Sequence, residues 1–275
     1  MPCSIKRLTP EGLQPVDYHA ESLADAARYE LDGVYTVTNT YDTTKVLKLS
    51  AHLDRLEDSA RREGIPVTLD RSRIRAALRE MIETCGYGDV RFRITIPRDQ
   101  PNEAVLSIEP FAPPPADVYA RGVRVVTLPE SRRDNPAAKT TGWMERRSAL
   151  QRAMPPGIYE GLLLSERGDL LEGMSSNFYA IVAGELRTAV EGILAGIAQQ
   201  VVLEIAPTII PVERKPVHVE DIPRLDEAFI SSASRGIVPV VEIDGVRIGD
   251  GAPGPFTRAL REAYLAWVRT NLEEL

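Results

Sequence analysis

The chain has 275 residues, of which 43% are hydrophobic and 27% charged, and its formal net charge at pH 7 is −7. This length allows one large domain or two modest domains, and the composition is ordinary for a soluble globular protein. The negative charge argues against nucleic acid as the main partner, and no window approaches the roughly 18 apolar residues of a membrane-spanning helix.

Cysteine, histidine and lysine usage limits the chemistry further. Two cysteines and three scattered histidines give no disulfide framework and no metal-type spacing, so no metal site is predicted. Residues 1–7 lack the apolar core of a signal peptide, so we expect a cytoplasmic protein. Arginine dominates the basic residues, and a retained lysine such as Lys139 hints at amine chemistry, because arginine cannot form a Schiff base.

The first part of the chain predicts a small α+β domain over residues 1–112. A short helix is expected over 18–29, followed by a strand over 33–40 that returns at 46–49. Ser50 can cap a helix over 51–63, and Asp70 can cap a second helix that ends near 85. Strands at 91–96 and 104–108 form a second hairpin, so two hairpins surround two helices.

A proline-rich segment separates this domain from the rest. Residues 113–120 include three consecutive prolines, Pro113 to Pro115, which favour a stiff, extended linker. We therefore place the interdomain linker at 113–120 and a larger domain at 121–275.

The larger domain is predicted to contain many short strands. A strand at 123–128 and a charged loop at 131–138 lead to Lys139, and Thr140 or Thr141 can cap a helix that ends near 154. Three or four strands follow over 161–188, then a helix over 197–205, strands near 209–213, 228–232 and 237–243, and a closing helix over 257–271. This order predicts a mixed or barrel-like sheet with flanking helices, and it carries neither a dinucleotide-binding nor a Walker fingerprint.

A polar turn lies between two apolar strands of this domain. The turn reads Glu172-Gly173-Met174-Ser175-Ser176-Asn177 and is flanked by Leu162–Leu164 and by residues 179–182. Burying a carboxylate, hydroxyls and an amide is costly unless something binds them. Alone, the stretch fits equally a hairpin whose polar turn faces water.

Four further features favour a phosphate ligand when they are taken together. Residues 192–198 form a glycine-flanked turn that opens a helix, and such a turn offers free backbone N–H groups. Residues 231–236 supply small hydroxyl side chains, Arg55 can point inward from its helix, and Lys139 ends a loop. Each feature has an ordinary structural explanation, but the set indicates a phosphorylated aromatic cofactor.

The same residues carry a family resemblance. The sequence resembles the class IV, fold-type IV family of pyridoxal-phosphate enzymes, which includes branched-chain aminotransferases, D-amino acid transaminases and 4-amino-4-deoxychorismate lyases. The matching segments run in the expected order and are His52-Leu53-Asp54-Arg55-Leu56, Lys139, Glu172 to Asn177, Leu194-Ala195-Gly196-Ile197, Asp226 to Phe229 and Val238-Pro239-Val240.

The resemblance implies the cofactor and the residues that hold it. Lys139 is expected to be catalytic and to carry pyridoxal 5′-phosphate as an imine, and Glu172 is expected to hold the pyridine nitrogen. The implied cofactor-binding set is Arg55, Lys139, Glu172, Ser175, Ser176, Asn177, Leu194, Gly196, Ile197, Ala198, Ser232 and Ala233. Ala198 and Ala233 stand where the family usually has a hydroxyl residue. A homodimer is also implied.

Substrate residues are expected on two strands of the small domain. Tyr35 and Val37 alternate on one strand, and Arg91 and Arg93 alternate on another, so each pair can share a face. We expect one arginine, Arg93, to bind the substrate carboxylate. A solvated sheet face explains the two arginines equally well.

The function predicted from the resemblance is transamination between an amino acid and a 2-oxo acid. The donor is a D-amino acid or a branched-chain-type L-amino acid. An alternative is elimination from an amino-chorismate-type substrate by the same lysine, although Val37 stands where such lyases carry a catalytic threonine. A protein that binds the cofactor without turnover is a third hypothesis.

Overall fold

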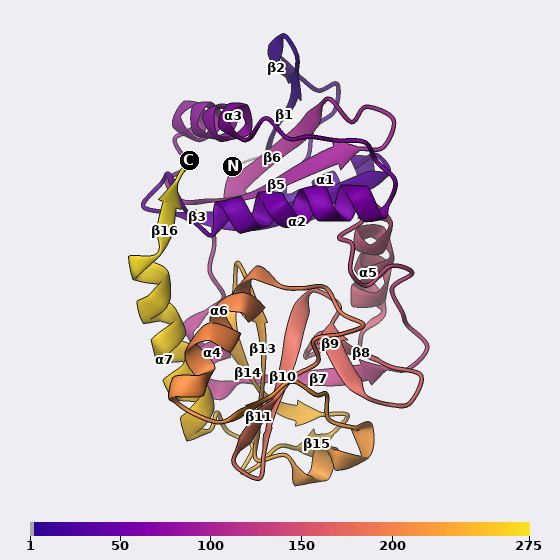
Figure 1. Ribbon diagram of the computed structural model, residues 1–275, viewed down its shortest axis with the longest axis vertical. Helices are drawn as coiled ribbons and strands as arrows, with labels where there is room; N and C mark the ends of the chain where they lie inside the picture. Colours follow the sequence, from indigo (N-terminus) through magenta and orange to yellow (C-terminus); the bar gives the residue numbers. More distant parts are fainter. Residues whose placement is uncertain (1–2) are drawn as a thin grey trace. The chain divides into compact units, whose positions relative to one another are not determined.

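The computed structural model describes residues 3–275, and they form two compact units (Figure 1). Unit 1 comprises the residues up to Ala112 together with Ala138–Ser148 and Asn271–Leu275, and unit 2 comprises Pro113–Ala137 and Ala149–Thr270. The predicted large domain, 121–275, therefore differs from unit 2, because it includes Ala138–Ser148 and Asn271–Leu275, which belong to unit 1 in the structure. Within the predicted linker, Pro113 to Pro115 are not helical, but residues 116–120 belong to helix α4, Ala116–Arg121, so this part of the linker is not extended.

Unit 1 is built on a seven-stranded sheet in the order β16-β4-β3-β5-β6-β1-β2. The two predicted hairpins are confirmed, and they join in one sheet through the antiparallel pairing of β3 with β5. Strands β1 and β2 were not predicted. The strands are β1 Ser4–Thr9, β2 Gly12–Pro15, β3 Gly33–Tyr41, β4 Lys45–Leu47, β5 Val90–Pro97, β6 Ala104–Pro110 and β16 Leu272–Glu274.

The helices of unit 1 confirm some of the predicted caps and correct others. The described helices are α1 Leu23–Ala26, the 3-10 turn η1 Ala27–Tyr29, α2 Leu49–Arg62 and α3 Arg71–Cys85. Asp70 caps α3 by accepting a hydrogen bond from the Arg73 N–H, as predicted. The helix predicted over 18–29 is wrong in extent, because Ser22 caps a helix that begins at Leu23.

The predicted Ser50 cap of α2 is also wrong. Ser50 lies inside the helix, and Lys48 is the N-cap residue in the left-handed region. The Glu273 carboxylate accepts a hydrogen bond from the Ser50 N–H at 3.1 Å, so a residue from the C-terminal strand satisfies this donor. The Leu275 side chain is buried in the core of unit 1, and Arg79 binds its backbone oxygen.

One face of the sheet of unit 1 packs against helices α2 and α3. Val34, Ile94 and Leu106 pack with Leu53 of α2 and Leu78 of α3. Because side chains alternate along a strand, Tyr35, Val37, Arg91 and Arg93 all lie on the opposite face. We call this opposite face, defined by those four residues, the substrate face.

Unit 2 is built on a nine-stranded sheet whose central part closes on itself. The order is β12-β11-β10-β13-β14-β7-β8-β9, with β15 on β14, and β9 also pairs with β10. This last pairing closes a ring of β7, β8, β9, β10, β13 and β14, so the predicted barrel-like sheet is confirmed. The strands are β7 Val123–Leu128, β8 Ile158–Leu164, β9 Leu170–Gly173, β10 Ser176–Val182, β11 Glu185–Arg187, β12 Val212–Glu213, β13 Glu227–Ser232, β14 Gly236–Ile243 and β15 Val246–Arg247.

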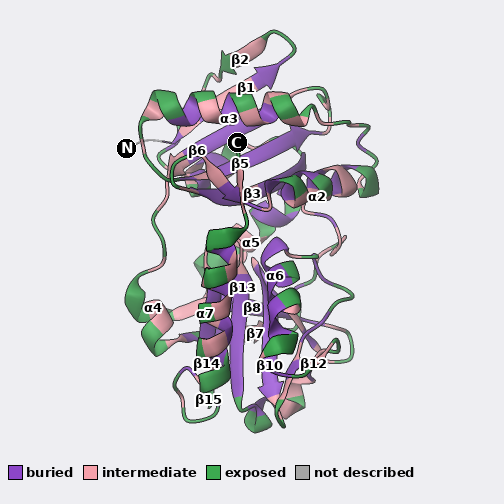
Figure 2. Cartoon of the chain, turned by 60° about the vertical axis from the view of Figure 1, so that its left-hand side comes forward, coloured by how far each residue is buried: buried purple, intermediate pink, exposed green. Residues whose placement is uncertain are grey.

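Helices cover the barrel of unit 2. Strands β10 and β13 are buried almost throughout, whereas exposed residues recur along α7 (Figure 2). Helix α6 begins and ends where predicted, but the strand predicted at 209–213 is reduced to β12. The remaining helices are α4 Ala116–Arg121, α5 Thr141–Ala153, α6 Ile197–Ile205, η2 Ala206–Thr208, η3 Val219–Arg224 and α7 Pro255–Thr270. Over residues 3–275, no helix is both long and apolar enough to cross a membrane.

Candidate active site

In unit 1, the segment that carries Lys139 lies along the edge of β3. The Tyr35 N–H donates to the Lys139 carbonyl oxygen at 2.9 Å, and Val34 forms a bridge with Thr140. The Lys139 N–H donates to Ser59 Oγ of α2 at 3.1 Å. A Cβ at Gly33 would overlap the Ile96 carbonyl oxygen, so glycine is required beside this edge. The backbone of Lys139 is therefore fixed by both a strand and a helix.

The Lys139 side chain lies against an aromatic ring. Its ammonium nitrogen is 4.9 Å from the centroid of the Tyr35 ring, which is within cation–π range. Tyr35 is buried and Lys139 is half-buried. The structure thus brings together the predicted catalytic lysine and one predicted substrate residue.

Helix α2 presents three polar side chains on one face. His52, Arg55 and Ser59 are spaced three and four residues apart, so they share that face. The Arg55 guanidinium donates to Thr36 Oγ1 at 3.3 Å, and Thr36 Oγ1 lies 2.9 Å from His52 Nδ1. Thr36 Oγ1 is therefore within hydrogen-bond distance of both Arg55 and His52. Arg55 therefore turns inward, as predicted.

The pKa of His52 predicts a pH effect on stability. Burial, and after it the charges of Arg55 and Lys139, hold this pKa well below its ordinary value of 6.5. The unfolded chain takes up a proton as the pH falls below about 6.5, whereas folded His52 stays neutral. We therefore expect the free energy of unfolding to fall by about 0.7 kcal/mol per pH unit at pH 6.5, and by about 1.4 kcal/mol per pH unit below about pH 5.5.

Urea unfolding at several pH values between 7.5 and 5 measures this slope. The His52→Asn variant keeps an acceptor near Thr36 and should show a flatter profile over the same range. Carboxylates with lowered pKa, such as Glu273, lose their contribution only below about pH 4.5, outside this window. Equal slopes in both proteins would contradict the assignment to His52.

The two predicted substrate arginines already have carboxylate partners. Arg93 Nη2 lies 2.6 Å from Glu30 Oε1, with side chains only 4% and 2% exposed. Arg93 Nη1 also donates to the Leu23 carbonyl oxygen at 3.0 Å. Arg91 lies 3.7 Å from Glu109. Glu30 was not predicted, because its position near a helix end carries no motif.

In unit 2, Glu172 is held at both carboxylate oxygens. Arg133 Nη1 donates to Oε1 at 3.1 Å, and the Leu194 N–H donates to Oε2 at 3.2 Å. The side chains of Arg133 and Glu172 are 5% and 3% exposed. Arg133 was not predicted, because it lies in the charged loop 131–138, where no periodicity or motif marks it. The predicted ring-nitrogen partner is thus a buried carboxylate in a fixed orientation.

Asn177, on the neighbouring strand β10, binds the same turn before α6 that Glu172 binds through Leu194. Asn177 pairs with Glu172 in the sheet, and its Nδ2 donates to the Leu194 carbonyl oxygen at 2.9 Å. A Cβ at Gly196 would overlap Asn177 Oδ1, so only glycine fits at this N-cap. The first N–H groups of α6, from Ile197 and Ala198 onward, have no acceptor within the helix, which makes this turn suited to an anion.

The predicted serines are part of a buried polar cluster. Glu160 accepts from Ser175 Oγ at 3.0 Å and from Ser176 Oγ at 3.1 Å, and Arg235 Nη1 lies 3.0 Å from the same carboxylate. Arg235 also donates to Ser232 Oγ at 2.8 Å. Three hydroxyls predicted to bind the cofactor therefore bind protein groups here, because buried Glu160 needs these partners. Ala233 is half-buried in the same turn.

We expect Arg235→Met to destabilise the protein strongly. Removing one partner of a buried ion pair typically costs about 3–5 kcal/mol, which corresponds to a fall in Tm of about 10 °C for a chain of this size. Thermal unfolding followed by circular dichroism measures the shift. Arg124→Met is the matched control, because the Arg124–Glu242 pair is half exposed and should contribute less than about 1 kcal/mol. Equal shifts would contradict the prediction.

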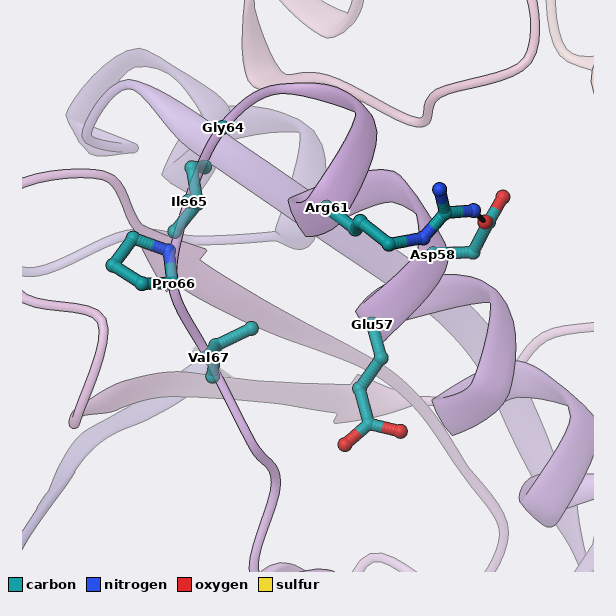
Figure 3. A pocket seen from close by; sticks show the side chains of 7 residues that line it. All are labelled: Glu57, Asp58, Arg61, Gly64, Ile65, Pro66 and Val67. Carbon is teal, nitrogen blue, oxygen red and sulfur yellow. Dashed lines mark hydrogen bonds and ion pairs between the residues drawn. The ribbon is translucent and has the colours of Figure 1, made fainter.

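A concavity elsewhere in unit 1 plays no part in this site. It lies beside the C-terminal end of α2 and has a volume of about 550 Å³ (Figure 3). Its carboxylates already bind arginines, since Glu57 binds Arg71 and Asp58 binds Arg61. The lining residues are Glu57, Asp58, Arg61, Gly64, Ile65, Pro66 and Val67, and none was predicted as a site residue.

Known proteins resemble the chain over most of its length. The family described as amino-transferase class IV matches residues 33–243. A D-alanine aminotransferase of Listeria monocytogenes is 30% identical over 251 residues, covering 85% of this chain and 86% of the relative. A branched-chain-amino-acid aminotransferase of Pseudomonas aeruginosa is 28% identical, covering 88% and 85%.

Solved structures show the same fold. A branched-chain amino acid aminotransferase of T.th. with pyridoxamine 5′-phosphate has a TM-score of 0.79 at 22% identity, covering 98% of each chain. The enzyme of Thermoproteus uzoniensis with norvaline also has a TM-score of 0.79, at 24% identity, covering 100% of this chain and 99% of that chain. The closed six-stranded barrel is the fold-type IV architecture that these solved aminotransferases share.

The chain belongs to the class IV aminotransferase family. It transfers an amino group between an amino acid and a 2-oxo acid.

Proposed function

We propose that Lys139 is the catalytic residue of this aminotransferase and that the donor is a D-amino acid or a branched-chain-type L-amino acid. The observation that carries the proposal is the fixed backbone of Lys139 with its ammonium group against the Tyr35 ring. The donor classes follow from the relatives, which include aminotransferases named for D-alanine and for branched-chain amino acids.

The residues fit the three polar ends of pyridoxal phosphate. In unit 1, Arg55 suits an anionic phosphate. In unit 2, the glycine-capped start of α6 also suits an anion, and a side chain at Gly196 would fill that turn. Buried Glu172 suits a protonated ring nitrogen, and Lys139 suits the aldehyde. When bound, the cofactor supplies an electron sink for the charge that develops at the substrate Cα. His52 Nε2 is buried, and it has no hydrogen-bond partner among residues 3–275. It adds a polar atom close to Arg55.

In the proposed mechanism, Lys139 Nζ would take the Cα proton of the amino donor, which leaves as a 2-oxo acid. In the second half of the reaction, Nζ would deliver a proton to the Cα of the amino acid formed from the 2-oxo acid acceptor. General acid–base catalysis of this kind contributes about 10²–10⁴-fold. Arg133 and the Leu194 N–H each bind one carboxylate oxygen of Glu172, and this carboxylate would hold the proton on the ring nitrogen of the cofactor. Arg55 would neutralise charge on the phosphate, and Tyr35 would orient the Lys139 ammonium, which lies 4.9 Å from its ring centroid.

Elimination from an amino-chorismate-type substrate is not favoured. The relatives compared above are aminotransferases, and Val37 carries no hydroxyl at the position where such lyases have a catalytic threonine.

We also expect a cytoplasmic homodimer from the family resemblance, and light scattering of the purified protein measures the assembly.

A product assay tests the proposal. The purified protein is incubated with D-alanine or L-leucine and a 2-oxo acid acceptor, and the new amino acid is resolved by chiral chromatography. We expect product only when both donor and acceptor are present. Pyruvate released from an amino-chorismate-type substrate without an acceptor would favour the lyase instead.

A further inference from the structure

A hollow in unit 2 contains none of the residues predicted to bind the cofactor or the substrate. Helices α4 and α7 both pack against β14, and the hollow is lined by these three elements and by the proline segment before α4. Its volume is about 760 Å³, within the range of about 300–1,000 Å³ that small-molecule sites occupy. All of its lining residues belong to unit 2, and we call it the α4–α7 hollow.

Prolines and a tyrosine supply the apolar part of the lining. Pro113 to Pro115 and Pro239 line the α4–α7 hollow, and proline rings lose almost no side-chain entropy when a ligand covers them. Tyr119 lines it as well, and its hydroxyl donates to the Arg235 carbonyl oxygen at 2.9 Å, which fixes the ring in place. The hollow therefore offers a preformed apolar surface to the body of a ligand.

Two arginines of α7 supply positive charge to the same hollow. Arg258 and Arg261 are three residues apart, so they share one face of the helix. The Arg261 guanidinium lies over the Tyr119 ring, 4.1 Å from its centroid, and this contact uses none of its N–H donors. Arg258 Nη1 donates to the Pro253 carbonyl oxygen. Neither arginine forms an ion pair with any residue between 3 and 275, so both charges are available to an anion.

A single carboxylate matches the charge of this lining. Glu262 also lines the α4–α7 hollow, so its charged side chains are two arginines and one glutamate, with a net charge of +1. A monocarboxylate balances that charge, and guanidinium groups bind carboxylates through paired N–H donors. Inorganic phosphate brings more negative charge near Glu262 and has no apolar part that could cover the prolines.

We propose that the α4–α7 hollow is a second ligand site, which binds a small monocarboxylic acid with an apolar body. The carboxylate accepts hydrogen bonds from Arg258 and Arg261, and the body lies against Tyr119 and the prolines. This inference goes beyond the proposed function and does not rest on it, because it concerns binding and not turnover.

Calorimetric titration of the holoenzyme with 4-fluorobenzoate tests the site. We expect Arg258→Gln and, separately, Arg261→Gln to weaken binding at least about tenfold, because each removes a charge-assisted contact with the carboxylate. Arg269→Gln is the matched control and should bind as wild type does, because it removes an exposed arginine from the last turn of the same helix, outside the hollow. Binding anywhere else on the enzyme would persist in all three variants.

Two further ligands separate the parts of the proposal. Acetate has the carboxylate without the body, so it should bind at least about tenfold more weakly than 4-fluorobenzoate. Holoenzyme crystals soaked with 4-bromobenzoate should show the anomalous signal of bromine beside Tyr119. The inference would be overturned by any of four results: no binding to wild type, wild-type affinity in both hollow variants, bromine found only outside the hollow, or displacement of 4-fluorobenzoate by equimolar inorganic phosphate.

Discussion

The Lys139→Ala variant is expected to lose transamination, with kcat/KM reduced by about 10⁴-fold or more. In the function proposed above, Lys139 supplies both the nucleophile and the proton carrier, and each of these roles typically accounts for several orders of magnitude in rate. Steady-state kinetics with the donor found in the product assay, followed by single-turnover measurements, would quantify the loss.

The structure indicates that this variant folds. The contacts of Lys139 with Tyr35 and Ser59 use its backbone carbonyl and N–H, and alanine keeps both. The matched control is Lys215→Ala, because the Lys215 side chain is 77% exposed and its ion pair with Glu213 contributes little. A Lys139→Ala protein that retains about a tenth of the wild-type kcat/KM would be inconsistent with a catalytic role.

The Glu172→Gln variant is expected to lower kcat by about 10²–10³-fold, the usual effect of removing one preorganised electrostatic group. It should also lower the free energy of unfolding by about 3 kcal/mol, because buried Arg133 loses its counter-charge. Kinetics at saturating cofactor and urea unfolding measure the two effects separately.

The Glu172→Asp variant distinguishes the effect of charge from the effect of side-chain shape, because aspartate keeps the negative charge on a shorter side chain. Aspartate restores the negative charge at a greater distance from Leu194, so its kcat should lie between those of wild type and Glu172→Gln. If Glu172→Asp were slower than Glu172→Gln, charge would not be the property that matters at this position.

Much of the fold follows from local sequence. Helix α6 begins after Gly196 and helix α3 begins after Asp70, where residues with a clear capping role stand. The turn at Asp244-Gly245 has both residues in the left-handed region, as its hairpin-type sequence predicted. Local signals failed where a distant residue replaces the expected partner. Ser50 was expected to cap α2, but Glu273 from the other end of the chain satisfies its N–H.

The same difference between local signals and distant partners decides which residues of the candidate site could be predicted. Glu172 and Asn177 could be predicted because they belong to one polar turn, and Gly196 because it stands in the glycine-flanked turn that opens α6. Arg133 and Arg235 could not, because their carboxylate partners lie 39 and 75 residues away along the chain. An ion pair between such distant residues leaves no periodic signal, and only the folded sheet brings the groups together.

The visible absorption spectrum of the purified protein tests the central claim most directly. The protein is reconstituted with pyridoxal 5′-phosphate and titrated with D-alanine and with L-leucine, and a 2-oxo acid is then added. We predict a yellow protein that bleaches with one of these donors and recovers its colour with the 2-oxo acid, whereas Lys139→Ala does not form the yellow species. A colourless wild-type protein that cannot be reconstituted, with a spectrum identical to that of Lys139→Ala, would contradict the account.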